Sequence, residues 1–416
     1  MARLLRKATG WFCAAALAAV GFCSPVPAQP VVAVSARIET LGDTSRLLVD
    51  LSASVKVEAF VLSDPDRVVV DLPEVNFQAE ASEGARRTLE AAGSLIRAFR
   101  GGSLGPGKSR IVFDVSGPAR VVKANVEKIA SGEPARLVIE LARTDKAGFA
   151  AAAAAGRLQA ARRPPAAPTS PVATAPAGKQ VIVLDPGHGG IDSGASAGAD
   201  VLEKSIVFEF ARRMAAQLEN TGRYKVVLTR NSDVFVSLDD RVRVARQANA
   251  ALFVSLHADT LADAADVQGA TFYTGSDKAS DAEAARLAEK ENRADIAAGV
   301  ESPEDATGVT DILADLTRRE TKAYSHLFAR SLAGVWQNAG RLNKNPQRSA
   351  GFKVLRASDV PSVLIELGYL SSTRDAANLT SAAWRDKAAG VAADAVNRFF
   401  ESRRTASPAS VAETLH

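Results

Sequence analysis

The chain has 416 residues, which is too long for one ordinary domain and predicts two. Its hydrophobic fraction of 47% is sufficient for sizeable cores. The formal net charge of +4 comes largely from the N-terminus and therefore gives no argument for a nucleic-acid partner.

The first residues have the pattern of a secretory signal peptide. A basic start precedes an apolar run over residues 11–23, and residues 26–28 read VPA, with small residues where a signal peptidase cleaves. We expect residues 1–28 to be removed and the protein to be periplasmic, with no stable membrane span after cleavage. An uncleaved anchor and a lipoprotein modified at Cys23 are the alternatives; bulky Phe22 disfavours the second.

Cleavage would change the composition in two ways. Both cysteines, Cys13 and Cys23, lie before the cleavage point, so the mature chain would have neither a disulfide nor a cysteine metal site. Three basic residues and no acid would leave with them, so that 48 basic residues face 47 acidic ones.

Residues 31–142 are predicted to form a small β-sandwich. Four short runs, of which residues 67–72 (RVVVDL) are typical, read as strands separated by Gly- and Pro-containing turns, and only residues 82–92 read as a helix. This part contains no histidine and no catalytic constellation. Residues 143–178 are rich in Ala and Pro and predict a flexible, partly extended linker.

Residues 179–401 alternate strand and helix patterns, which predicts an α/β domain with a twisted mixed sheet flanked by helices. The helix expected over 203–219 has apolar residues at helical spacing. The expected strands are 181–185, 225–229, 251–256, 268–273 and 361–367, and the other expected helices are 238–248, 310–338 and 381–401. The tail, residues 402–416, is expected to be disordered.

Two of the four histidines directly follow strand-like runs. His188 lies in the Gly-rich run DPGHGG (185–190), and His257 ends the run ALFVSLH (251–257). A third run ends in Glu366. Because loops at the strand ends of an α/β sheet gather side chains into a site, these residues are candidates for a metal centre.

Glu203 lies at the expected start of the helix that follows the Gly-rich run. With His188 and His257 it would complete a set of three zinc ligands and leave a fourth position open. Glu366, in an apolar strand where burial is costly unless the group is used, would suit a general base. Structural roles for the histidines, and a helix-dipole role for Glu203, remain the alternatives.

Residues 180–400 resemble the zinc-dependent N-acetylmuramoyl-L-alanine amidases of the cell-division type. The resemblance rests on LDPGHGGIDSGA (184–195), Glu203, Arg241, SLHAD (255–259) and LIELGYLS (364–371).

This resemblance implies specific roles for individual residues. His188, Glu203 and His257 would bind one Zn²⁺ per catalytic domain, and Glu366 would be the catalytic carboxylate. The substrate would be peptidoglycan, cleaved between the lactyl group of N-acetylmuramic acid and L-alanine. Residues expected to support the ligands from behind are Asp185, Asp192, Asp259 and Arg241.

Residues 31–142 resemble the AMIN domain through DRVVVDL (66–72) and IRAFR (96–100). This implies a peptidoglycan-binding β-sandwich that targets the enzyme, often to the division site.

Residues 279–309 form an insertion that contains the helix-like run AEAARLAEKEN (282–292). It resembles the regulatory helix of division amidases, which implies that a glutamate covers the zinc until an activator protein of the LytM type displaces the helix. Glu291 is the predicted residue and Glu289 its rival; an exposed, solvated helix is the alternative.

Two other functions use the same residues. A catalytically silent wall-binding scaffold is disfavoured because the whole ligand set is present. A zinc peptidase is compatible with two histidines and one glutamate, but the order of the motifs favours the amidase.

Overall fold

The structure is a computed structural model that describes residues 31–77, 94–129, 134–161, 178–198, 200–261, 267–300 and 312–406. The expected signal peptide, the expected helix at 82–92 and the second part of the expected linker lie outside these ranges. None of the described helices combines the length and the apolar character that a membrane span requires.

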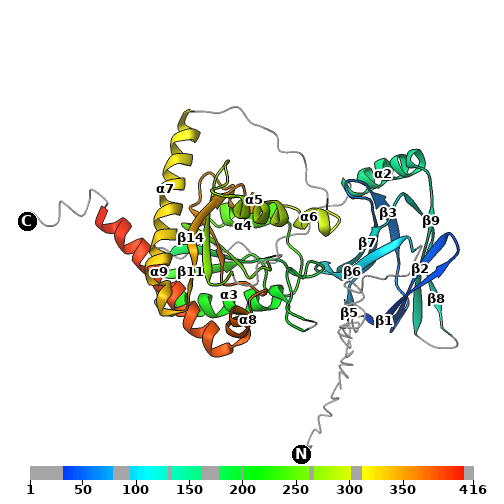
Figure 1. The fold of residues 1–416 in the computed structure, drawn as a ribbon, viewed down its shortest axis with the longest axis horizontal. Coiled ribbons are helices and arrows are strands. Elements are labelled where there is room, and N and C mark those ends of the chain that lie inside the picture. Colours follow the sequence, from blue (N-terminus) through cyan, green and yellow to red (C-terminus); the bar gives the residue numbers. More distant parts are fainter. Residues whose placement is uncertain are drawn as a thin grey trace, which may run out of the picture. The chain divides into compact units, whose positions relative to one another are not determined.

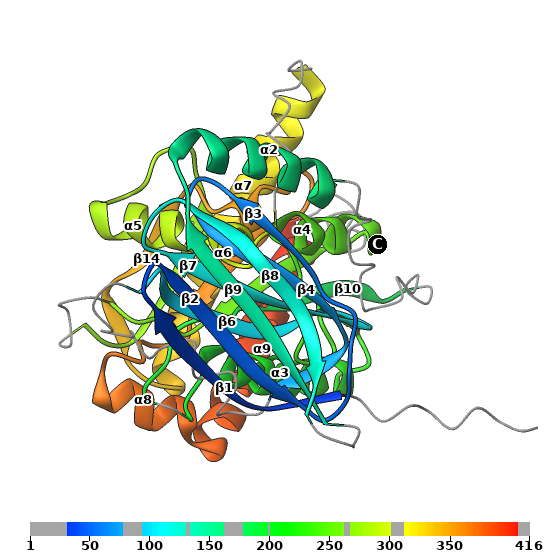
Figure 2. The same ribbon diagram turned by 90° about the vertical axis from the view of Figure 1, so that its right-hand side faces the viewer.

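The described residues from Val31 to Arg143 form two stacked antiparallel-rich sheets with an apolar core between them (Figure 2), as predicted. Alternating side chains such as Val49, Phe113 and Leu137 are buried in this core. One sheet has the order β5-β1-β2-β9-β8, with β1 (Val31–Leu41), β2 (Thr44–Leu51), β5 (Val75–Phe77), β8 (Ala119–Lys128) and β9 (Ala135–Arg143). The other has the order β3-β4-β7-β6, with β3 (Glu58–Leu62), β4 (Arg67–Pro73), β6 (Ile96–Gly105) and β7 (Lys108–Val115).

The first part of the expected linker is a helix, so the prediction of a flexible segment is wrong there. Helix α2 (Lys146–Ala161) packs beside β3 (Figure 1). Alanine has the highest helix propensity, and α2 buries Phe149 and Ala153 against the sandwich. At Gly156 the helix approaches so closely that an added Cβ would lie 2.2 Å from the carbonyl oxygen of Val61.

The C-terminal part contains a mixed six-stranded sheet of order β11-β10-β12-β15-β13-β14. Its strands are β10 (Gln180–Pro186), β11 (Tyr224–Leu228), β12 (Leu252–His257), β13 (Ala270–Gly275), β14 (Leu342–Ala350) and β15 (Ser362–Glu366). Strands β11, β10, β12 and β15 run parallel, whereas β13 is antiparallel to β15.

Helices cover both faces of this sheet, as predicted. One core includes residues of α3 (Glu203–Asn220), α7 (Ile312–Val335), α8 (Thr373–Thr380) and α9 (Ala382–Ala406). The core on the other face includes residues of α4 (Leu238–Gln247) and α5 (Ala282–Glu291). Short helical turns follow at α6 (Ala294–Ala297), η1 (Trp336–Asn338) and η2 (Lys353–Leu355).

Helix α9 continues to Ala406, so the disorder expected from Ser402 is wrong for its first residues. In this last part of the helix the guanidinium of Arg403 lies 4.0 Å from the centre of the Tyr324 ring on α7, a contact that favours the ordered helix. The expected tail beyond residue 406 lies outside the described residues.

The parallel register brings three strand ends to the same edge of the sheet. Pro186 of β10 is opposite Leu256 of β12, and His257 is opposite Glu366 of β15. The loop that carries His188 therefore begins beside the residues that end β12 and β15.

The contact between α2 and β3 can be tested with two glycine variants. Gly156→Ala should lower the free energy of unfolding by about 1–3 kcal/mol, because its Cβ meets the Val61 carbonyl. Gly334→Ala in α7, where a Cβ meets open space, should instead raise it by up to about 1 kcal/mol. Calorimetric unfolding of both variants measures this; an equal rise in both would contradict the docking of α2.

Candidate active site

The Gly-rich loop after β10 places His188 in the site. His188 has a φ of 58°, in the left-handed region that most residues avoid. Two glycines make room for the rings: a Cβ at Gly187 would lie 2.6 Å from the His257 ring, and one at Gly194 would lie 2.6 Å from both His188 and Glu203. The loop sequence therefore allows two imidazoles and a carboxylate to meet.

His188, Glu203 and His257 meet in a buried cluster whose ligand atoms all lie within 4.8 Å of one another. His188 Nε2 and His257 Nδ1 each lie 3.2 Å from Oε1 of Glu203. Both ring nitrogens are buried without a hydrogen-bond partner. Two unpartnered nitrogens directed at one carboxylate oxygen are a suitable donor set for a metal ion.

Neighbouring groups hold this donor set in place. Asp192 Oδ2 lies 2.8 Å from His188 Nδ1, which fixes the ring. Glu203 accepts the backbone N–H groups of Ala195 (2.7 Å) and Ala258 (2.8 Å).

The electrostatics of the cluster favour opposite charges on its members. Burial acts to raise the pKa of Glu203, but the two imidazoles outweigh it and hold the pKa well below the ordinary value. Burial acts to lower the pKa of His188, whereas the carboxylates of Asp192, Glu203 and Glu291 raise it well above the ordinary value. The site therefore attracts a cation, whether a proton or a metal ion.

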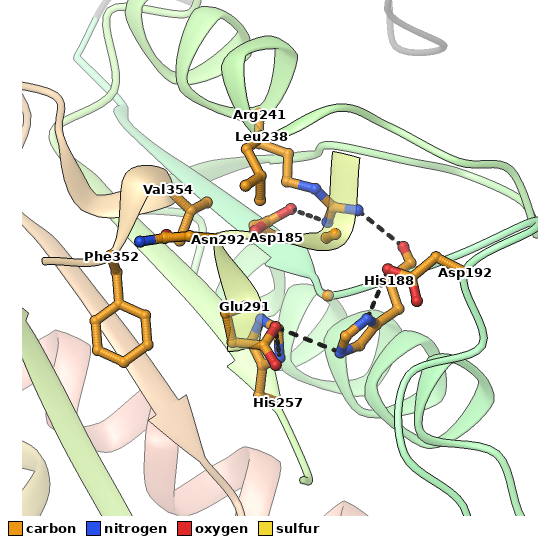
Figure 3. A pocket seen from close by; sticks show the side chains of 12 residues that line it. Asp185, His188, Asp192, Leu238, Arg241, His257, Glu291, Asn292, Phe352 and Val354 are labelled. Atoms are coloured by element: carbon orange, nitrogen blue, oxygen red, sulfur yellow. Dashed lines mark hydrogen bonds and ion pairs between the residues drawn. The ribbon is translucent and has the colours of Figure 1, made fainter. Parts of the chain in front are cut away.

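Asp185 and Arg241, both predicted to support the site, form a buried ion pair of 2.7 Å behind the loop (Figure 3). Asp185 also accepts the hydroxyls of Thr229 (2.6 Å) and Ser255 (2.8 Å). Arg241 in turn donates to the carbonyl oxygen of His188 at 2.9 Å. The pair thus ties the Gly-rich loop to β10, β12 and α4.

Arg230 has a similar role that the sequence analysis missed. Its guanidinium donates to the carbonyl oxygens of Pro186 (3.0 Å), Gly187 (3.1 Å) and Lys204 (2.8 Å). Burial lowers its pKa to about 10. Arg230 lies just after β11, which pairs in parallel with β10, the strand that leads to His188. This position at the same sheet edge is the sequence signal that could have identified it.

Glu366 is completely buried at the end of β15, beside His257. Its Oε2 accepts the backbone N–H of Asp259 at 3.0 Å, and its Oε1 has no hydrogen-bond partner. Burial, together with the charges of Asp259 and Glu203, raises the pKa of Glu366 well above the ordinary value. A carboxyl group with a raised pKa can both take and return a proton near neutral pH.

Helix α5 of the insertion covers the cluster, and Figure 3 shows Glu291 directed at both histidines. Glu291 Oε2 lies 3.3 Å from His257 Nδ1 and 3.6 Å from His188 Nε2, and the residue is 6% exposed. Its rival Glu289 is exposed and pairs with Arg293. Of the two predicted glutamates, only Glu291 reaches the histidines.

The end of the insertion contacts the β-sandwich, within one compact unit that begins at Val31. Arg110 of β7 donates to the carbonyl oxygens of Ala298 (3.2 Å) and Gly299 (2.6 Å), and Arg100 of β6 donates to that of Ala297 (2.8 Å). The described part of the insertion is therefore held from two sides, by the sheet beneath α5 and by the sandwich.

Comparisons with known proteins identify the family to which both parts of the chain are similar. A family model described as N-acetylmuramoyl-L-alanine amidase matches residues 182–398, and the AMIN domain model matches residues 35–141. AmiC of Neisseria meningitidis serogroup B is 32% identical over 413 residues, covering 96% of this chain and 97% of that protein. AmiC of Escherichia coli O6:H1 is 30% identical over 384 residues, covering 89% and 90%. The solved structure of AmiC2 from Nostoc punctiforme is 29% identical, with a TM-score of 0.40, and covers 54% of this chain and 99% of that one.

The ion pair behind the loop gives a prediction for stability. Asp185→Asn keeps the shape of the side chain but leaves the buried Arg241 guanidinium without its counter-charge, so we expect a loss of about 3 kcal/mol in unfolding free energy. Asp277→Asn, at a side chain that is 98% exposed, is the matched control. Denaturant unfolding followed by tryptophan fluorescence reports on this domain, since Trp336 and Trp384 both lie in it. Equal stability of the two variants would contradict the assigned role.

Proposed function

We propose that this chain, which belongs to the N-acetylmuramoyl-L-alanine amidases, works with one zinc ion held by His188, Glu203 and His257. Membership of the family makes it a peptidoglycan amidase of the AmiC type. The metal, the resting state, the activator and the role in daughter-cell separation are the parts that we propose.

The donor set fits zinc on chemical grounds. Imidazole nitrogens favour zinc over magnesium or calcium, and two histidines with one carboxylate make a common catalytic zinc set. Asp192 beside His188 Nδ1 leaves Nε2 as the donor facing the centre. The observation that carries the proposal is the pair of buried, unpartnered ring nitrogens on either side of Glu203.

The chain's own residues supply the proton chemistry. When bound, zinc would polarise the scissile carbonyl and lower the pKa of the attacking water. Glu366 would take a proton from that water and return it to the leaving nitrogen, which its buried carboxyl with one unpartnered oxygen supports. The backbone N–H of Asp259 steadies the Glu366 carboxylate for this exchange.

The resting enzyme is proposed to be self-inhibited by Glu291, whose carboxylate lies where a fourth ligand would approach the histidines. A carboxylate in that position excludes both the water and the substrate. Activity then requires a partner that binds the open state better than the covered one, for which we propose an activator of the LytM type.

Because peptidoglycan is outside the cytoplasm, the enzyme acts there, and we propose the periplasm, reached through the signal peptide at residues 1–28. The β-sandwich is proposed to bind peptidoglycan and bring the catalytic domain to the wall at sites of division.

Self-inhibition can be tested with a single substitution. Glu291→Ala should raise the release of stem peptides from sacculi, without an activator, by about tenfold or more if the covered state is favoured by at least 1.4 kcal/mol. Glu289→Ala, two residues away and exposed, should leave activity unchanged. Deletion of residues 279–309 should act in the same direction, but it also removes buried Ala284, Leu287 and Ala288. A Glu291→Ala protein that is folded and no more active than the parent would rule out the block.

The metal is tested on the same Glu291→Ala chain. A chelator should abolish release of stem peptides that carry a free L-alanine amine, and added zinc should restore it. His257→Ala should lose both bound zinc, measured by atomic absorption, and activity, whereas His326→Ala at an exposed position on α7 should lose neither. Activity that survives complete metal removal would overturn the zinc proposal.

A further inference from the structure

The covering helix presents two successive charges to the site, and only one of them is explained by blocking a metal. Glu291 faces the two histidines, while the ammonium group of Lys290 forms an ion pair with the carboxylate of Asp259. Asp259 is 1% exposed, whereas the Lys290 side chain is about half exposed, so this second contact links the surface of α5 to a buried carboxylate.

The carboxylate of Asp259 is fixed beside the proposed general base. Its backbone N–H donates to Glu366 Oε2 at 3.0 Å, and its carbonyl oxygen accepts the N–H of Leu370 at 2.7 Å. Its Oδ1 accepts the N–H of Thr260 at 2.6 Å and the ammonium of Lys290. Its Oδ2 is buried without a hydrogen-bond partner.

A buried carboxylate with an unused oxygen costs free energy unless it serves a ligand. In the covered state Lys290 supplies a cation to Asp259. When α5 leaves, Lys290 leaves with Glu291, because the two are adjacent on the same helix. Asp259 then loses its cation and keeps a carboxylate that can accept a cationic amine where the Lys290 ammonium lay.

The reaction itself produces such a group. Hydrolysis forms a carbon–oxygen bond at the lactyl carbonyl and breaks its bond to the alanine nitrogen. Both protons of the water end on that nitrogen, so the products are a carboxylate and a primary ammonium group. The nitrogen must lie within reach of Glu366, which returns a proton to it. The backbone N–H of Asp259 contacts Glu366, and the negative charge of Asp259 is near enough to help raise the pKa of Glu366.

We propose that Asp259 binds the amine that is released from L-alanine, and that Lys290 and Glu291 occupy the covered site as an imitation of the two products. Glu291 stands for the lactyl carboxylate, and Lys290 stands for the alanine ammonium. This inference rests on the proposed function of the same site. It assigns Asp259 a role in binding the product and late transition state, beyond its support of Glu366.

The alternative is that Asp259 merely anchors Lys290. A half-exposed lysine in an ion pair contributes little to stability, so this pair alone is a weak lock. If Asp259 only anchors Lys290, a stem peptide with a free amine should bind no more tightly than one with an acetylated amine. If Asp259 is an amine site, the free-amine peptide should bind more tightly, which allows a direct test.

The test uses the full mature chain with Glu291→Ala and measures binding of two synthetic stem peptides by calorimetry. One peptide has a free α-amine on L-alanine and the other has that amine acetylated. We expect the free-amine peptide to bind about tenfold or more tightly, as a charge-assisted hydrogen bond to a carboxylate implies.

Asp259→Asn in this background should abolish the preference, since asparagine retains an acceptor for Thr260 but not the charge. Asp259→Glu should retain the preference, and the exposed Asp277→Asn should not change it. Unfolding curves show whether each variant is folded. If Asp259→Asn does not fold, the Asp259→Glu variant is the test: loss of the preference for the free amine in that variant would overturn the amine site.

Two failures can be told apart. If the Glu291→Ala chain releases stem peptides with free L-alanine amines, but Asp259→Asn keeps the parent's preference, the amine site is wrong and the amidase proposal stands. If the Glu291→Ala chain releases no such peptides from sacculi, the proposed mode of action is wrong. A preference for the free amine that depends on Asp259 would then still support the amine site, and its absence would overturn that site as well.

Discussion

The parallel pairing of β10, β12 and β15 is the constraint on which the site depends. Because these neighbouring strands end at the same sheet edge, His257 and Glu366 are direct neighbours, and the loop with His188 starts next to them. Helix α3 begins at the same edge, so its first residue, Glu203, can reach both histidines. The backbone hydrogen bonds of the sheet therefore determine where β10 and β12 end, and so where two of the three donors lie.

Charge compensation is the second requirement, because several carboxylates share one buried space. The same environment lowers the pKa of Glu203 and raises that of Glu366, since the first faces two imidazoles and the second faces Asp259 and Glu203. Two carboxyl groups a short distance apart can therefore act differently, one as an anionic ligand and the other as a proton carrier. Lys290 on α5 adds a positive charge to this group through its contact with Asp259.

Residues at strand ends were the most predictable part of the molecule, because a short apolar run followed by His or Glu has few arrangements in an α/β sheet. The parts that sequence reasoning missed depend on tertiary contacts. Strand β14 (LNKNPQRSA) lacks an apolar alternation, since it is an edge strand in contact with β13. The Ala-rich composition of α2 is also typical of a linker, and its helix is explained by its packing against β3. Arg230 acts through contacts with distant backbone carbonyls and lies in no local sequence motif. Helical spacing places Glu291 on the same face of α5 as Leu287 and Ala288, and Glu289 on another face. What the sequence does not show is that this face lies over the two histidines.

The composition of α5 sets the free-energy scale of the proposed regulation. Its buried face consists of Ala284, Leu287, Ala288 and Glu291, so α5 itself contributes only one large apolar side chain to this contact. Burial of one leucine contributes about 1.5–3 kcal/mol, and the polar contacts of Glu291 and Lys290 add to this. Shifting a two-state equilibrium from 1:99 to 99:1 requires about 5.5 kcal/mol of differential binding. Because α5 covers the site with charged groups and a small apolar face, the free energy needed to displace it would be within the binding free energy of an ordinary protein partner.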